Sequence, residues 1–408
     1  MKSSNQSITA SAQSWLMELD TWIARNGLRG YDPFDVKQHG LVRRAQPYPS
    51  MRKSTTVLCD LFPTATRRLL RVAPTENPKA YALLALGKLR FFELTGDEAH
   101  LDAAKAALDW LVDHANPDHP GLGWGYPFDV TAKGLVTPKN TPVAVVCAIG
   151  GEALLRAADL CGDARYIANA RSVAVFLTTG LPFLEQPDGT GSFAYAPTDK
   201  RRVHNANLLT AAFLRRLAAV TGEKTGVEQA VRAEAFSLAR QRPDGSWPYG
   251  EADPSEPYEP SLMNIVDHHH TGFVLRALND LWQSSTGDPV SAALKRGVRY
   301  YRSLFSSSGM PLTAAGRYPV DIHACAEGIL CPSVLKDRFP AARGLAPKTV
   351  KWTYYHLRRP RDGAPYYRQY PFVRSRLVAP RWGVAWMYWA LSEFLIHHLA
   401  EASNAEED

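Results

Sequence analysis

The sequence repeats one pattern, in which polar or aromatic residues stand just before an apolar helical run. The pattern occurs six times, and its occurrences begin at Asn77, Asn140, His204, His268, His323 and Trp382. The residue numbers of successive starts differ by 63, 64, 64, 55 and 59. A period of this kind predicts a fold assembled from one supersecondary unit that is used several times.

Each unit is predicted to be a helical hairpin. The apolar runs end at LTGD, LCGD, VTGE and STGD, which occupy residues 94–97, 160–163, 220–223 and 285–288. A glycine that adopts a left-handed conformation ends one helix, and the acidic residue after it favours the start of the next. Residues 99–114, 164–177 and 289–304 follow with apolar residues three and four apart. That spacing indicates a second, amphipathic helix in the unit.

Six hairpins in a closed ring predict an all-α (α/α)6 toroid with the more apolar helices inside. The alternative is an open superhelix. Closure is favoured because the period accounts for nearly the whole chain, so we expect one toroid domain over residues 1–400 and an acidic disordered tail over 401–408. Loops rich in Gly, Pro and aromatic residues separate the helices, and we expect short β-hairpins from them at the rim.

The composition narrows the class of partner. The chain has a formal charge of +7, but its cations are dispersed and no nucleic-acid-binding motif accompanies them. An acidic sugar or glycan is therefore favoured over nucleic acid.

The sequence has neither a secretory h-region nor a membrane span, which predicts a cytoplasmic protein. The five cysteines show no CxxC pair, which predicts reduced thiols. The sequence gives no indication of oligomeric state.

Closure of the ring would gather the six starts at one mouth. Histidine is suited to proton transfer near neutral pH, and an Asn beside a His could hold a sugar carboxylate while the His acts as base. An alternative is that Asp267, Asp321 and Asn205 only cap helices. His323 and Cys325 diverge on a helix, so no metal or other cofactor is predicted. The candidate catalytic residues are His204, Asn205, Asp267, His268, His270, Asp321, His323 and Glu327.

Aromatic and charged residues near the same mouth are candidates for binding substrate. Trp382 and Trp386 are four apart and share a helix face that could stack on sugar rings, although core packing is the alternative for Trp386. Arg381 has the bidentate geometry that suits a carboxylate. The candidate substrate-binding residues are Trp124, Tyr126, Asp129, Lys139, Asn140, Trp247, Arg381, Trp382 and Trp386.

Five motifs carry a resemblance to a known family. GWGYPFDV, VHNANLL, VDHHHTGFVLRAL, YPVDIHACAEGIL and RWGVAWMYWAL occur in this order. Together they resemble a VpsJ-like family of bacterial surface-polysaccharide biosynthesis proteins, which implies a biosynthetic context but no particular reaction. More distantly, the predicted toroid resembles N-acylglucosamine 2-epimerases, uronyl C5-epimerases, unsaturated glucuronyl hydrolases, and the toroids of alginate and heparin lyases. No catalytic residue is transferred from these enzymes.

Three functional hypotheses follow. The first is a carbohydrate-active enzyme that uses acid/base chemistry at a carbon beside a carboxylate or carbonyl, as an epimerase or lyase does. The second is a glycoside hydrolase that uses paired carboxylates, which would come from Asp129, Asp267, Asp321 and Glu327. The third is a glycan-binding or assembly protein without catalytic activity.

Overall fold

Six helices form a closed inner ring in the computed structural model, which describes residues 2–45, 48–132, 135–253, 263–283, 288–313 and 316–404. Each inner helix packs against the next, and the last packs against the first. The predicted (α/α)6 toroid is therefore confirmed, and the open superhelix is excluded. The inner helices are α5 (Pro78–Thr95), α7 (Ala144–Cys161), α9 (His204–Thr221), α12 (His268–Gln283), α14 (Ile322–Leu335) and α16 (Ala385–Asn404), the last preceded by a π-helical turn, η4 (Pro380–Val384).

Six outer helices cover this ring. They are α6 (Glu98–Asp113), α8 (Ala164–Val175), α10 (Val227–Leu238), α13 (Asp288–Ser303), α15 (Leu345–His356) and α1 (Lys2–Asn26). Helix α1 packs against α15 and α16, so the sixth hairpin joins the first and last helices. The buried Trp15 fixes this junction, since its Nε1 donates to the carbonyl oxygen of Gly363 at 2.7 Å. Helix α1 precedes the first repeat, so the repeat pattern did not predict its role.

The first two hairpin connections form as the sequence predicted, whereas in the third Gly226, and not the expected Glu223, precedes the start of α10 (Val227–Leu238). Gly96, Gly162 and Gly222 end α5, α7 and α9 in the left-handed conformation. Asp97 and Asp163 then cap α6 and α8 through their carboxylates. Ser285 to Gly287 of the fourth connection lie outside the described residues.

Short strands line the rim, where hairpin-like loops were expected. Two are local hairpins, β1 (Val130–Ala132) with β2 (Leu135–Thr137) and β3 (Phe183–Glu185) with β4 (Gly191–Phe193). By contrast, β5 (Arg202–Val203) pairs with the distant β6 (Gly250–Glu251). A three-stranded sheet has the order β7 (Val320–Asp321), β8 (Arg368–Gln369) and β9 (Arg374–Ser375), and it sets Asp321 opposite Arg368.

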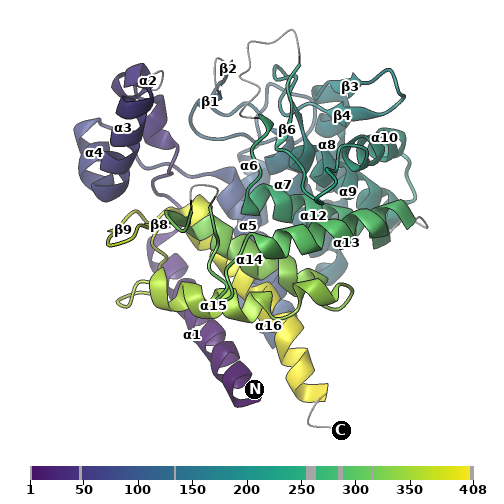
Figure 1. Ribbon diagram of the computed structural model, residues 1–408. Coiled ribbons are helices and arrows are strands. Elements are labelled where there is room, and N and C mark those ends of the chain that lie inside the picture. Colours follow the sequence, from purple (N-terminus) through teal and green to yellow (C-terminus); the bar gives the residue numbers. More distant parts are fainter. Residues whose placement is uncertain are drawn as a thin grey trace.

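Residues 35–70 form a helical projection, which we call the lobe. It consists of the 3-10 turn η1 (Asp35–Gln38) and the helices α2 (Gly40–Ala45), α3 (Pro49–Leu61) and α4 (Pro63–Leu69). Figure 1 shows the lobe standing out at the upper left, while both termini lie at the opposite end. The lobe has a small core of its own, made by Val36, Val42 and Cys59, and α3 also packs against β9.

Helix α16 continues to Asn404, so residues 401–404 of the expected tail are helical, and residues 405–408 lie outside the described part. Among the described residues, none of the helices combines the length and apolar character that a membrane crossing requires. All five cysteines are free thiols, as predicted.

Candidate active site

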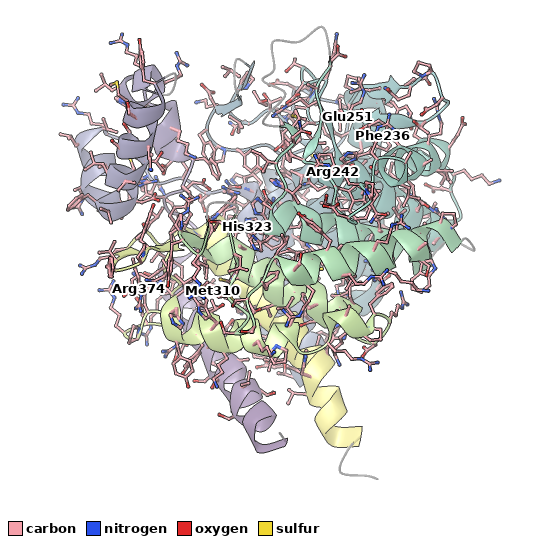
Figure 2. The ribbon with its side chains drawn as sticks, in the orientation of Figure 1. Phe236, Arg242, Glu251, Met310, His323 and Arg374 are labelled. Carbon is pink, nitrogen blue, oxygen red and sulfur yellow. The ribbon has the colours of Figure 1, made fainter. Side chains whose placement is uncertain are left out.

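A cavity of about 1000 Å³ opens where the inner helices begin. All six helix starts contribute to its wall, so the predicted convergence of the repeats on one mouth is confirmed. Figure 2 shows His323, on α14, near the centre of the molecule. The contributions from the six helix starts are Lys79 (α5), Val145 (α7), Asn205 (α9), His268 to His270 (α12), His323 (α14) and Trp382 (η4).

Asp267 and His270 form a hydrogen-bonded dyad at the start of α12. One carboxylate oxygen of Asp267 accepts from the backbone N–H of His270 at 2.8 Å, so Asp267 caps the helix. The other oxygen lies 2.7 Å from Nδ1 of His270. Burial opposes ionisation of Asp267, yet the adjacent His269 and His270 hold its pKa well below the usual range. With Nδ1 donating to this carboxylate, Nε2 of His270 is left to meet a ligand in the cavity.

A stack of neutral aromatic rings forms the floor of the cavity. The His323 ring lies between that of His269, with centroids 4.6 Å apart, and that of Trp386, with centroids 4.7 Å apart. Trp382 meets the edge of His323 at 4.4 Å. Burial lowers the pKa of His269 to about 3 and that of His323 well below its usual value. Neither ring nitrogen of His323 has a hydrogen-bond partner among the described residues. Both imidazoles are therefore neutral, and His323 is the one of the two without a polar partner among the described residues, since Nδ1 of His269 lies 3.4 Å from Asp267.

Two lysine amines face the cavity without an anionic partner among the described residues. Lys79 extends from α5, and its Nζ lies 5.5 Å from the ring centroid of Phe273 on α12 and 5.4 Å from that of Trp386. Burial, with a smaller contribution from Arg381, lowers the pKa of Lys79 to about 7. Lys37 of the lobe lies over Phe34, and burial lowers its pKa to about 8.

The two arginines of the cavity wall are neutralised by carboxylates instead. Arg381 makes a bidentate ion pair with the buried Asp32, at 2.6 and 2.8 Å. Arg368 bridges Asp321 at 3.0 Å and Asp60 at 3.2 Å. Arg381 and Arg368 are therefore already paired, whereas Lys79 and Lys37 are cations of the cavity wall that no carboxylate pairs among the described residues.

Polar groups on the α7 and α9 side complete the wall. Asn205 is not a helix cap, since α9 begins one residue earlier, and it lines the cavity with a buried Oδ1 that has no partner among the described residues. Tyr126, Tyr195 and Tyr249 lie beside it. Burial raises the pKa of Tyr249 to about 12, so its hydroxyl is neutral and able to donate. The ring centroid of Tyr249 lies 4.6 Å from that of His270.

His204 and Glu327 do not line the cavity, contrary to the sequence-based interpretation. His204 is fully buried against α10, where its Nδ1 lies 3.1 Å from the hydroxyl of Ser237. Glu327 lies one helical turn below His323 and forms a buried ion pair with Arg276 at 2.7 Å. Both positions lie in the layers between helices, so both side chains are structural.

His268 and Asp321 reach the cavity, but other contacts occupy their functional groups. Nε2 of His268 is bonded to the carbonyl oxygen of Leu304 at 2.9 Å. Asp321 caps α14 by accepting from the N–H of His323 at 2.9 Å. It also accepts from Nε1 of Trp382 at 2.7 Å. Asp321 therefore positions its neighbours.

Of the tryptophans expected to bind substrate, only Trp382 lines the cavity. Trp124 donates to the carbonyl oxygen of Leu111 at 2.7 Å, and Trp247 donates to that of Ser237 at 2.8 Å. Both are buried in hairpin cores. Trp386 is fully buried beneath the floor, so core packing, the alternative considered for it, is what the structure shows.

Three further substrate-binding candidates lie on the rim. Asp129 accepts from the backbone N–H of Lys139 at 2.9 Å, and the side chains of Lys139 and Asn140 are exposed. None of the three belongs to the cavity wall. Tyr126 and Arg381, from the same predicted set, do belong to it.

Lys79, Lys37 and Tyr195 line the cavity but were not predicted from the sequence. A signal existed for Lys79, which is the one charged residue in the first turn of an otherwise apolar run, NPKAYALLALG. Lys37 lies outside the repeat, so the period gave no reason to place it at the mouth.

One group of residues is arranged as possible metal ligands. Asp267, His269 and His270 each offer a ligand atom, and these atoms lie within 4.8 Å of one another. In the structure, the same carboxylate and Nδ1 of His270 bond directly to each other.

No model of a known protein family matches the chain, and no curated protein sequence matches it. Solved structures do share its fold. Cellobiose 2-epimerase from Bacillus thermoamylovorans B4167 has a TM-score of 0.62 at 9% identity, over 79% of this chain and 88% of that chain. The enzyme of the same name from Spirochaeta thermophila has a TM-score of 0.61 at 13% identity, over 81% and 89%. A GH76 α-mannanase from Bacteroides thetaiotaomicron has a TM-score of 0.58 at 12% identity, over 81% and 88%. At these identities the likeness establishes the toroid fold alone.

Proposed function

We propose that this protein is a carbohydrate-active enzyme that performs histidine-based acid/base chemistry on an acidic sugar or glycan, as an epimerase or lyase does. The Asp267–His270 dyad carries the proposal. A carboxylate that fixes one imidazole nitrogen leaves the other as an oriented base, which is the arrangement that proton abstraction requires.

Two cations of the cavity that lack a carboxylate partner support an acidic substrate. Lys79 and Lys37 have no anionic partner among the described residues, whereas the arginines of the wall are neutralised by carboxylates. A substrate carboxylate beside Lys79 would satisfy the buried amine. The cavity volume of about 1000 Å³ is at the upper end of the usual range for small-molecule sites, large enough for an oligosaccharide segment. The Trp382 face and the unpaired Oδ1 of Asn205 suit a sugar ring and its hydroxyl groups.

In the proposed reaction, Nε2 of His270 removes the proton from the carbon beside the substrate carboxylate. The electron pair moves onto the carboxylate, and the Lys79 ammonium stabilises the added negative charge. In an epimerisation, a second donor returns a proton to the opposite face. In an elimination, the oxygen on the next carbon leaves with a proton supplied by the same donor. The neutral His323 and Tyr249 are candidates for this donor.

The hydrolase alternative is less favoured by the geometry. The carboxylates that line the cavity among the described residues are Asp267 and Asp321, and both cap helices and hold neighbouring side chains. A glycosidase needs two carboxyl groups directed at the substrate.

We further propose that the reaction belongs to bacterial surface-polysaccharide biosynthesis, because the five sequence motifs resemble proteins of that process. The cytoplasmic location expected from the sequence stays a prediction.

The test is incubation of the protein with a panel of uronic-acid glycans in deuterated water. Deuterium incorporation, new unsaturation and new reducing ends are read together. His270→Ala and Asp267→Asn should each reduce turnover at least about a hundredfold, the usual scale of acid/base catalysis. Asn at position 267 retains the capping role, so the fold is preserved. His114→Ala is the matched control, because His114 is exposed at the end of α6 and away from the cavity.

New reducing ends without deuterium incorporation, in a His270→Ala variant that stays active, would show hydrolysis instead. Glycan binding that persists in all variants without any turnover would show a binding protein.

A further inference from the structure

The lobe has more large apolar side chains exposed to solvent than it has residues in its own core. Its core comprises Val36, Val42 and Cys59. Of the fifteen large hydrophobic side chains that are exposed among the described residues, six lie within this short segment. These six are Leu41, Tyr48, Met51, Leu58, Phe62 and Leu69. Contiguous exposed apolar residues mark an interaction surface.

The exposed residues follow the geometry of the helices. Met51 and Leu58 are seven residues apart, so they lie on one side of α3, and Phe62 follows at the C-cap of the helix. Cys59 faces the lobe core instead. Leu69, at the end of α4, is 83% exposed. The α3 helix therefore has a second apolar face that nothing covers among the described residues.

The same lobe carries an uncompensated positive charge. Between residues 35 and 71 the carboxylates are Asp35 and Asp60, and both are engaged by the arginines Arg67 and Arg368. Apart from Lys37, which faces the cavity, the remaining described lysines and arginines are exposed and have no ion pair among the described residues. They are Arg43, Arg44, Lys53, Arg68 and Arg71.

The turn between β8 and β9 extends this surface. Phe372 is 97% exposed and Val373 is 48% exposed at its tip. Arg374 and Arg376 follow and are exposed as well. Because β9 packs against α3, the turn lies next to the lobe. Figure 2 shows Arg374 at the outer edge of the molecule, below the lobe.

We propose that the lobe and the β8–β9 turn form a docking surface for an anionic lipid bilayer. Exposed apolar side chains beside arginine and lysine are the pattern by which helices lie on a membrane, with the apolar tips among the acyl chains and the cations at the headgroups. A nucleic acid would use the charges but leave the apolar tips in water. Side chains as protruding as Phe372 and Leu69 suit a soft surface better than the shaped groove that a protein partner would need.

Docking in this way would bring the cavity close to the bilayer. Lys37 of η1 and the adjacent Phe34 line the cavity, and Arg368 of β8 joins the cavity wall to Asp60 of α3. The inference does not depend on the reaction proposed above, because it rests on the outer faces of the lobe and not on the cavity.

The test is co-sedimentation of the full chain with vesicles of phosphatidylcholine alone and of phosphatidylcholine mixed with phosphatidylglycerol. Binding is expected only to the mixed vesicles and should weaken as salt is added. Neutralising one cation near an anionic surface weakens partitioning about fivefold, so Arg43→Ala/Arg44→Ala should weaken it roughly 25-fold. Phe62→Ser/Leu69→Ser should weaken binding while the salt dependence remains.

The matched control is Lys351→Ala/Tyr355→Ser, which removes an exposed cation and an exposed aromatic ring from α15 without touching the lobe. It should bind like the wild type. Circular dichroism and thermal unfolding check that each variant is folded. The proposal is overturned if the mixed vesicles are not bound, if neutral vesicles are bound equally well, or if the lobe variants bind like the control. It is also overturned if the wild type instead self-associates through the lobe, as seen by light scattering, or binds an acidic polymer such as RNA in preference to vesicles.

Discussion

Replacing Lys79 with methionine should stabilise the fold while removing the anion site. The Lys79 side chain is 3% exposed, and its amine has no anionic partner among the described residues. Its pKa falls from 10.5 to about 7. At about 1.4 kcal/mol per pH unit, this shift means that burying the amine costs roughly 4 kcal/mol at pH 7. Methionine retains the apolar stem and loses cation–π contacts worth about 1 to 2 kcal/mol, so a net gain of roughly 2 to 3 kcal/mol is expected.

The gain has a defined pH dependence. Between pH 7 and 10.5 the unfolded chain keeps the Lys79 proton and the native state releases it. Wild-type stability therefore rises with pH in this window, and the cost of Lys79 disappears at its upper end. The advantage of Lys79→Met should be largest at or below pH 7 and should shrink toward pH 10.

Urea unfolding at pH 7 and pH 9, followed by circular dichroism, measures this difference. Lys88→Met is the matched control, because Lys88 is also buried but is ion-paired with Asp20, so its removal should destabilise the protein. A Lys79→Met variant that is less stable than the wild type, or whose advantage does not change with pH, would refute the reasoning.

Three further outcomes are expected. His204→Ala should lower stability by about 2 to 4 kcal/mol without affecting turnover, because the ring is buried against Ser237. Burial lowers the pKa of His204 in the wild type to about 3, so below pH 6.5 the unfolded chain binds a proton that the native state does not. The wild type therefore loses stability as the pH falls from 6.5 toward 3, and the variant should lose stability less steeply in an acid titration. Glu327→Gln should destabilise by about 3 to 5 kcal/mol in thermal or urea unfolding, since it leaves Arg276 buried without its charge partner. Binding of a uronate at pH 8 should take up close to one proton as Lys79 is recharged, which calorimetry in buffers of different ionisation enthalpy would detect.

The repeat could be predicted from the sequence because a few neighbouring residues determine where each helix starts and ends. Asn77 caps α5 and Gly96 ends it, so the sequence determines where the first inner helix begins and ends. The direction of each side chain was not readable. His204 and Asn205 are neighbours, but successive residues on a helix differ by about 100°, so one turns to the outer layer and the other to the cavity.

The depth of each side chain along the ring axis could not be predicted from the sequence either. His323 and Glu327 share a face of α14, but one turn of helix separates the mouth from the core. The reach of the long Lys79 side chain could not be predicted either, and its Nζ lies 5.5 Å from the ring centroid of Phe273 on another inner helix. The lobe was not predicted because its residues lie outside the repeat and show no repeated pattern of their own.

The pairing of α1 with α16 bears on how this protein folds during its synthesis. Glu18 of α1 bonds to Arg358, and Glu393 of α16 bonds to Arg90 on α5. These contacts join segments about three hundred residues apart, so no partial chain can complete the ring. While the middle hairpins leave the ribosome, α1 and α5 still lack their last neighbour and expose the apolar faces that α16 will cover. We therefore expect nascent chains that lack α16 to need a chaperone, and the cavity to form only when that helix docks.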